Sequence, residues 1–106
     1  MITLEKTNGS SDSIPILLFL GHSYYTNYFV ENNELATTLL KKAWLLGSID
    51  AAEELSFFYN KFDEPEKAYF WSVRSENINR DAEKRLKLDT VNNLKKLAKQ
   101  KEVVDF

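Results

Sequence analysis

The chain has 106 residues, of which 43% are hydrophobic and 13% aromatic, a size that supports one modest core and therefore one domain. It contains no cysteine, which excludes disulfides, thiolate metal sites and cysteine nucleophiles and fits a reducing compartment such as the cytoplasm. Its net charge of -2 opposes nonspecific nucleic-acid binding, because that binding draws its energy from a surplus of lysine and arginine.

The N-terminal segment, residues 1–12, is polar and includes the turn-forming run Asn8-Gly9-Ser10-Ser11, so we expect a flexible tail there. It lacks a basic segment followed by an apolar one, and we therefore expect no secretion signal. The longest apolar run, residues 14–20, is far shorter than the roughly 20 residues that span a bilayer. This run predicts a core helix, and no membrane partner is expected.

A first helix is predicted over about residues 14–29. Ser13 can cap it, and Pro15 in its first turn needs no intrahelical donor. Its apolar side chains recur at helical spacing. They are Leu17, Leu20, Tyr24 and Tyr28.

Two further helices are predicted in the middle of the chain. Asn33 can cap the first of them, and Gly47 can end it. The next can be capped by Ser48, or by Asp50 with Glu53 in a capping box. The buried faces consist of Ala36, Leu39, Leu40 and Ala43 in one helix and of Ala51, Ala52, Leu55, Phe58 and Tyr59 in the other.

The remaining segment predicts two more helices. Asp63 and Glu66 have the spacing of a capping box, with Pro65 in the first turn of a fourth helix that ends near Asn77. Asn79 can cap a long fifth helix. The inward residues are Ala68, Trp71 and Val73, followed by Ala82, Leu86, Val91, Leu94, Leu97 and Ala98. Together these segments predict an all-α fold of about five helices in antiparallel hairpins, one domain over residues 13–106.

The pattern also repeats along the chain. Leu20-Gly21-x-x-Tyr24, followed by Ala36-x-x-Leu39-x-x-x-Ala43-x-x-x-Gly47, is matched by a second unit. That unit keeps the leucine, tyrosine and first alanine and replaces Leu39 by tryptophan. Its matching residues are Leu55, Ser56, Tyr59, Ala68, Trp71 and Ser75, with serine in place of both the glycine and the later alanine.

This pattern resembles the Sel-one-like repeats, relatives of the tetratricopeptide repeat. Their units combine Leu-Gly-x-x-Tyr in a first helix with Ala-x-x-Trp-x-x-x-Ala-x-x-Gly in a second. The resemblance covers about residues 14–82 and describes two degenerate repeats followed by a C-terminal capping helix. It implies a short right-handed stack of helical hairpins whose work is to bind other proteins.

Residues for catalysis or metal binding are scarce. His22 is the sole histidine and lies inside a helical pattern, where we expect an exposed or binding-face side chain. Glu53 and Glu54 are adjacent and therefore diverge on a helix, which disfavours a metal site. The three glycines are too scattered for a nucleotide-binding loop. We expect no enzyme activity, metal or cofactor.

Charge is divided along the chain, with an acidic segment at residues 31–66 and a basic one at 74–101. They form either two solvated faces or, in the acidic segment, a recognition patch. We predict a cytoplasmic protein-binding module, preferably a bacterial immunity protein that inhibits a basic toxin such as a nuclease by occluding it. An adaptor or scaffold domain and a nucleic-acid-binding protein that uses the basic fifth helix are the alternatives.

The resemblance implies that the first helix of each hairpin lines a concave binding face. An aromatic such as Phe57 beside the acid Glu54 has the composition of a binding hot spot. Charge reversal at Glu53 and Glu54 is therefore expected to weaken binding of the partner. The predicted partner-binding residues are His22, Tyr25, Glu53, Glu54, Phe57, Asn60 and Lys61.

Overall fold

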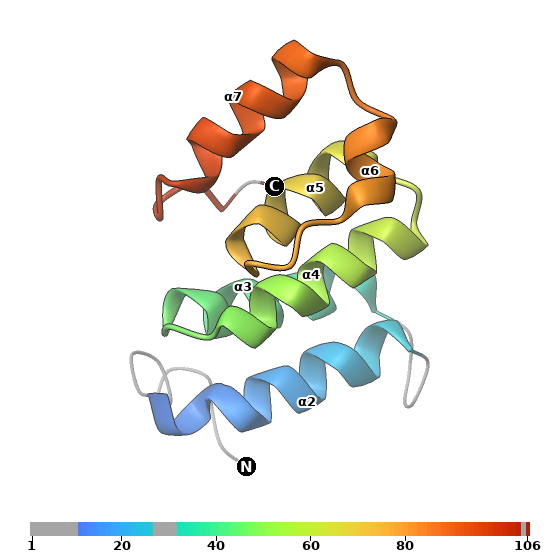
Figure 1. Cartoon of the computed structure of the whole chain (residues 1–106). Helices are drawn as coiled ribbons and strands as arrows, with labels where there is room; N and C mark the ends of the chain where they lie inside the picture. The colour runs from blue at the N-terminus through green and yellow to red at the C-terminus, as the bar shows by residue number, and fades with distance from the viewer. Residues whose placement is uncertain (1–10, 27–31, 105) are drawn as a thin grey trace. The chain divides into compact units, whose positions relative to one another are not determined.

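The computed structural model describes residues 11–26, 32–104 and 106. These residues are all-α, as predicted, and contain no β-strand (Figure 1). The chain divides within α4 into two compact units, Met1–Ala51 and Ala52–Phe106. The elements are the 3-10 helix η1 (Ser11–Ser13) and the helices α2 (Ile14–Tyr25), α3 (Asn33–Leu45), α4 (Ile49–Lys61), α5 (Pro65–Arg74), α6 (Arg80–Lys84) and α7 (Leu88–Ala98).

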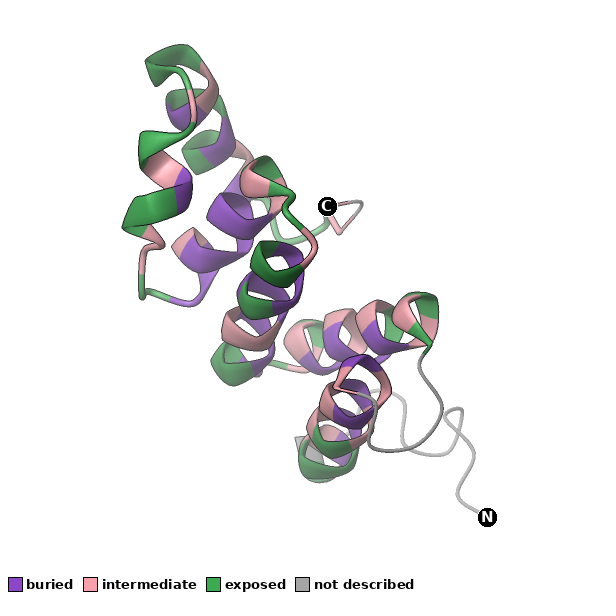
Figure 2. Ribbon diagram, turned by 90° about the vertical axis from the view of Figure 1, so that its right-hand side faces the viewer, coloured by how far each residue is buried: buried purple, intermediate pink, exposed green. Residues whose placement is uncertain are grey.

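In the first unit α2 packs against α3, and both helices carry buried residues, which are purple in Figure 2. A Cβ atom at Gly21 would lie 2.7 Å from Cγ of Leu40 and 3.3 Å from the carbonyl oxygen of Ala36. The close approach therefore requires a residue without a side chain. The core of this unit consists of Leu17, Leu39, Ala43 and Ala51, with Leu20 and Tyr24 only partly buried against it.

The ends of α2 and α3 differ slightly from the prediction. The described part of α2 ends at Tyr25, and Tyr28 lies outside the described residues. Asn32, not Asn33, caps α3, since its side-chain oxygen accepts a bond of 3.0 Å from the N–H of Leu35. Gly47 follows the end of α3 with a φ of +109°, a conformation that glycine adopts without strain, as predicted.

Both predicted capping boxes are wrong. The Ser48 hydroxyl caps α4 by accepting a bond of 3.1 Å from the N–H of Ala51, so Asp50 lies inside the helix. Asp63 has a left-handed φ of 58° and pairs with Arg85 at 2.8 Å instead of capping α5. A serine thus replaces the predicted cap of α4, whereas α5 has no side-chain cap bond at its N-cap residue, Glu64. The spacing alone revealed neither outcome.

In the second unit α5 is the central helix, because both α6 and α7 pack against it. Ala68 and Trp71 are buried, as predicted, whereas Val73 is only half-buried. Tyr69 and Phe70, the two residues between Ala68 and Trp71, are also fully buried. A helix covered on several sides buries consecutive residues, and it loses the single apolar face that a periodicity search detects.

The predicted long fifth helix is wrong, because α6 and α7 are separate. Asn79 does cap α6, accepting a bond of 3.0 Å from the N–H of Ala82. After Lys84 the chain tightens into a turn, and Lys87 adopts an extended backbone before α7. This break lets the buried side of each helix, Ala82 in α6 and Leu94 in α7, pack against α5.

Arg74, at the end of α5, is buried and holds the chain that follows α7. Its guanidinium donates three hydrogen bonds to backbone carbonyl oxygens, which satisfy acceptors at the end of that helix. Burial lowers the pKa of Arg74 to about 10, and Glu102 acts in the opposite direction. The acceptors are the oxygens of Ala98 at 3.0 Å, Gln100 at 2.5 Å and Val103 at 2.7 Å.

Candidate functional site

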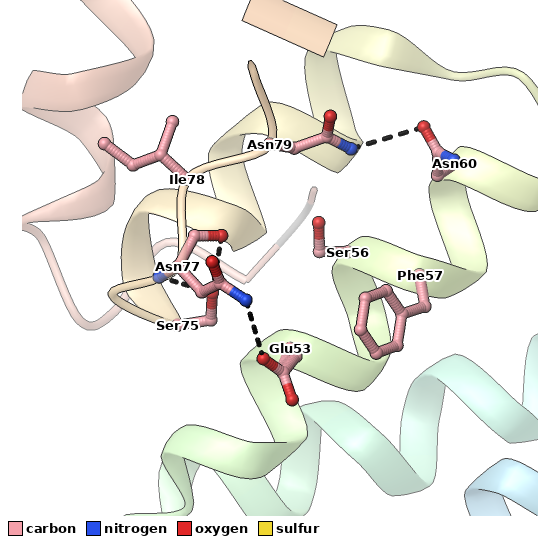
Figure 3. Close-up of a pocket in the computed structure, with 8 residues that line it drawn as sticks. All are labelled: Glu53, Ser56, Phe57, Asn60, Ser75, Asn77, Ile78 and Asn79. Atoms are coloured by element: carbon pink, nitrogen blue, oxygen red, sulfur yellow. Dashed lines mark hydrogen bonds between the residues drawn. The ribbon is translucent and has the colours of Figure 1, made fainter. Parts of the chain in front are cut away.

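A hollow of about 240 Å³ lies in the second unit, between α4 and the loop that joins α5 to α6 (Figure 3). Pockets for drug-sized ligands measure roughly 300–1,000 Å³, so this hollow suits a single side chain of a larger partner. Its lining is mixed in polarity and includes one charged residue. The eight residues are Glu53, Ser56, Phe57, Asn60, Ser75, Asn77, Ile78 and Asn79.

The wall formed by α4 follows from helical spacing. Glu53, Phe57 and Asn60 lie four and three residues apart and therefore share one side of the helix. Phe57 is 54% exposed, a high value for a large apolar residue. Ser56 is buried beside them, and its hydroxyl donates to the carbonyl oxygen of Ala68 at 2.9 Å.

The opposite wall is a turn after α5. Glu76 has a left-handed φ of 64°, which reverses the chain at this point. The Ser75 hydroxyl donates to the carbonyl oxygen of Ser72 at 2.7 Å and accepts from the N–H of Asn77 at 3.2 Å. These bonds hold the turn that directs the loop toward α4.

Two side-chain hydrogen bonds connect the walls. The Asn77 amide donates to Oε2 of Glu53 at 3.2 Å, and the Asn79 amide donates to the side-chain oxygen of Asn60 at 3.3 Å (Figure 3). Among the described residues none donates to Oε1 of Glu53. The hollow therefore presents one carboxylate oxygen, the phenyl ring of Phe57 and side-chain amides.

Groups with displaced pKa values lie outside the hollow. Burial, together with the nearby Glu64 carboxylate, raises the pKa of Tyr59 to about 12. Burial and a hydrogen bond to Glu83 raise the pKa of Tyr69 to about 12. A hydrogen bond from Arg80 is the largest influence that lowers the pKa of Glu83. Within the described part of the chain, no three histidine or carboxylate side chains lie together as a metal site.

The structure brings three of the seven predicted partner-binding residues to the hollow, namely Glu53, Phe57 and Asn60. Glu54 and Lys61 are also on α4, half-buried and exposed respectively, but do not line the hollow. The other two predicted residues, His22 and Tyr25, belong to the first unit.

The prediction that Tyr25 faces outward is wrong, because its side chain is buried. In α2 the buried stripe runs through Leu17, Gly21 and Tyr25, four residues apart. His22 is half-buried, and its ring lies edge-on to Tyr25 with the centroids 5.3 Å apart. The close helix contact at Gly21 therefore sets the rotation of α2.

Sequence reasoning missed the loop side of the hollow. Ser75, Asn77, Ile78 and Asn79 are distant from α4 in sequence, and no helical period relates them to Glu53. The available signal was the pair of asparagines in a short segment between two helices. Such residues are common in turns, so the signal predicts a turn and not a site.

Comparison of the chain with protein-family models, with curated proteins and with solved structures found no match. The resemblance to Sel-one-like repeats therefore stays a prediction from the residues that carry it. None of the helices in the described ranges combines the length and apolar character needed to cross a bilayer.

Proposed function

We propose that this chain is a protein-binding helical-repeat module and that the hollow on α4 is its partner-binding site. The observation that carries the proposal is the half-exposed phenyl ring of Phe57, next to the carboxylate of Glu53 in a concave surface. Aromatic side chains supply much of the binding energy at protein interfaces, and nearby charges select the partner. A stoichiometric binder of this kind needs no catalytic residues.

Similar helix contacts in two helical hairpins, α2 with α3 and α4 with α5, support the proposal that the chain consists of repeat units. In α2 the Gly21 position faces the carbonyl oxygen of Ala36, and in α4 the hydroxyl of Ser56 donates to the carbonyl oxygen of Ala68. The two glycine-or-serine positions are matched in the sequence repeat, and so are the two alanines. Equivalent helix contacts are what related repeat units would make.

Within this class we propose the role of a cytoplasmic immunity or inhibitor protein that occludes a basic toxin, such as a bacterial nuclease. The acid Glu53 in the hollow supports a basic partner, since complementary charges increase the association rate and the specificity. An inhibitor of this kind blocks its partner by covering the partner's active surface. A small binding module is sufficient for that task.

The first test compares two exposed apolar residues. Phe57, on α4, and Leu88, at the start of α7, are 54% and 73% exposed. We expect Phe57→Ala to weaken binding to a co-purified partner by about 2 kcal/mol, because truncation of a hot spot has this effect, and Leu88→Ala to leave it unchanged. Calorimetry measures both affinities. Equal affinity of wild type and Phe57→Ala would contradict the proposed site.

The second test separates neighbouring acids. Charge reversal of both Glu53 and Glu54 is expected to weaken binding by at least about 1.4 kcal/mol, or tenfold, with helicity unchanged. Glu53 lines the hollow and Glu54 does not, so Glu53→Lys should account for most of the lost affinity and Glu54→Lys for little of it. The affinities are measured at low and high salt. If the double variant binds like wild type at both salt concentrations, the acidic surface is not the surface that recognises the partner.

A further inference from the structure

The hollow has binding capacity that the described residues do not use. Asn77 occupies Oε2 of Glu53, whereas none of the described residues donates to Oε1. Phe57, one turn further along α4, is more than half exposed and lines the same hollow as the Glu53 carboxylate (Figure 3). A ligand that fits must therefore donate a hydrogen bond to a carboxylate and also contact an aromatic ring.

Arginine meets both requirements better than other side chains do. Its guanidinium is planar, carries five N–H donors and stacks on aromatic rings while it pairs with a carboxylate. Lysine has a compact, strongly hydrated ammonium group that does not stack in this way. The volume of about 240 Å³ suits one such side chain and is smaller than the usual pocket for an organic ligand.

The chain already holds one of its own arginines with similar chemistry. The guanidinium carbon of Arg74 lies 4.4 Å from the ring centre of Phe70 and 4.8 Å from that of Trp71. The same group donates hydrogen bonds to three carbonyl oxygens. Aromatic rings combined with oxygen acceptors therefore bind an arginine within this unit, and the hollow offers the same two components at its surface.

We infer that the hollow binds an arginine side chain from an exposed segment of the partner protein. The guanidinium donates to Oε1 of Glu53 and packs against the phenyl ring of Phe57. The side-chain amides of Asn60 and Asn77, at the edges of the hollow, are placed to bond with the backbone of that segment. This inference rests on the proposed function and specifies the chemistry of the partner.

The test uses three blocked pentapeptides, each with glycine at every position except the centre, which holds arginine, lysine or citrulline. Citrulline has nearly the shape of arginine without its charge. Each is titrated into the isotope-labelled full chain, and NMR shifts of the Asn60 and Asn77 side-chain amides are followed. We expect the arginine peptide to bind about tenfold more tightly than the citrulline peptide, as for loss of a charge-assisted hydrogen bond, with lysine between them.

A matched pair of variants shows whether Glu53 is responsible. Glu53→Gln keeps an oxygen for the Asn77 amide and should abolish the preference for arginine over citrulline. Glu54→Gln removes the same charge from the next residue of α4, outside the hollow, and should keep the preference. Equal binding of arginine and citrulline peptides to wild type, or a preference that survives Glu53→Gln, would overturn the inference.

The calorimetric test of Phe57→Ala separates this inference from the proposed function. If Phe57→Ala weakens binding of the partner protein while the peptides show no preference for arginine, the hollow is the protein-binding site but does not select arginine. If the peptides show the preference and Phe57→Ala leaves the partner's affinity unchanged, the arginine site is established and the proposed partner-binding site is wrong.

Discussion

The two helical hairpins, α2 with α3 and α4 with α5, solve one packing problem in two ways. In the first, Gly21 has no side chain, and a Cβ atom there would clash with Leu40 at 2.7 Å. In the second, Ser56 occupies the matched position, and its hydroxyl bonds to the carbonyl oxygen of Ala68. Close approach of helices therefore depends on a small residue there, and a hydroxyl can be accommodated where it finds an acceptor.

The hairpins differ more in how their first helix is rotated. Leu55 and Tyr59 are buried in α4, whereas their matched residues in α2, Leu20 and Tyr24, are only partly buried. In α2 the adjacent position, Tyr25, is buried instead. A repeated sequence pattern thus indicates which helices pair, but neighbouring contacts decide which residues of the pattern face the core.

The largest expected effect concerns Trp71, which is matched by Leu39 in the first hairpin. Both side chains are almost fully buried. Trp71→Ala should lower the free energy of unfolding by about 3 to 5 kcal/mol and Leu39→Ala by about 2 to 5, since each deletion leaves a cavity. Urea unfolding followed by circular dichroism measures both. A loss below about 1 kcal/mol for Trp71→Ala would contradict its place in the core.

Arg74 distinguishes the second hairpin from the first, where the matched residue is the half-buried Lys42. We expect Arg74→Ala to lower the free energy of unfolding by about 3 kcal/mol, because buried carbonyl oxygens lose a charged donor. Lys42→Ala should change it by less than about 0.5 kcal/mol. Hydrogen exchange of residues 98–103 should accelerate only in the first variant. Equal losses of unfolding free energy in Arg74→Ala and Lys42→Ala would show that the hydrogen bonds of Arg74 add no stability.

The small residues at the helix contacts test the comparison directly. Gly21→Ala should destabilise the chain by about 2 kcal/mol, because overpacking forces Leu40 or the helices to move. Ser56→Ala removes one buried hydrogen bond and should cost about 1 kcal/mol. Thermal unfolding measures both changes. If Gly21→Ala leaves the stability unchanged, the contact at Gly21 does not set how closely α2 and α3 approach each other.

The smallest effect concerns Tyr69, whose hydroxyl donates to Oε2 of Glu83 at 3.2 Å. Tyr69→Phe should cost about 1 kcal/mol at pH 7, the value of one hydrogen bond. The folded-state pKa of about 12 exceeds the ordinary value of 10, so this contribution is complete below pH 10 and is lost as the pH rises through 12. Unfolding measured across this range should therefore be less pH-dependent in Tyr69→Phe. If the free energy of unfolding depends on pH between 10 and 12 in the same way in Tyr69→Phe and in wild type, the raised pKa of Tyr69 is contradicted.

Local signals in the sequence were sufficient for most helix positions. Ser48 and Asn79 were identified as caps, and the helix end at Gly47 followed from its conformational freedom. The break between α6 and α7 was missed, because neither glycine nor proline occurs at residues 85–87. Packing of both helices against α5 accounts for that break, and such packing is absent from any local signal.

Sequence alone determined the all-α class, the small residues at which the paired helices meet, and the residues of α4 that line one side of the hollow. Helical spacing is sufficient to place Glu53, Phe57 and Asn60 on one side of a helix. Only the tertiary structure decided the other side, because the left-handed turn at Glu76 and the bonds around Ser75 direct Asn77 toward Glu53. Contacts between residues distant in the chain depend on the path of the backbone, and no periodicity in the sequence specifies that path.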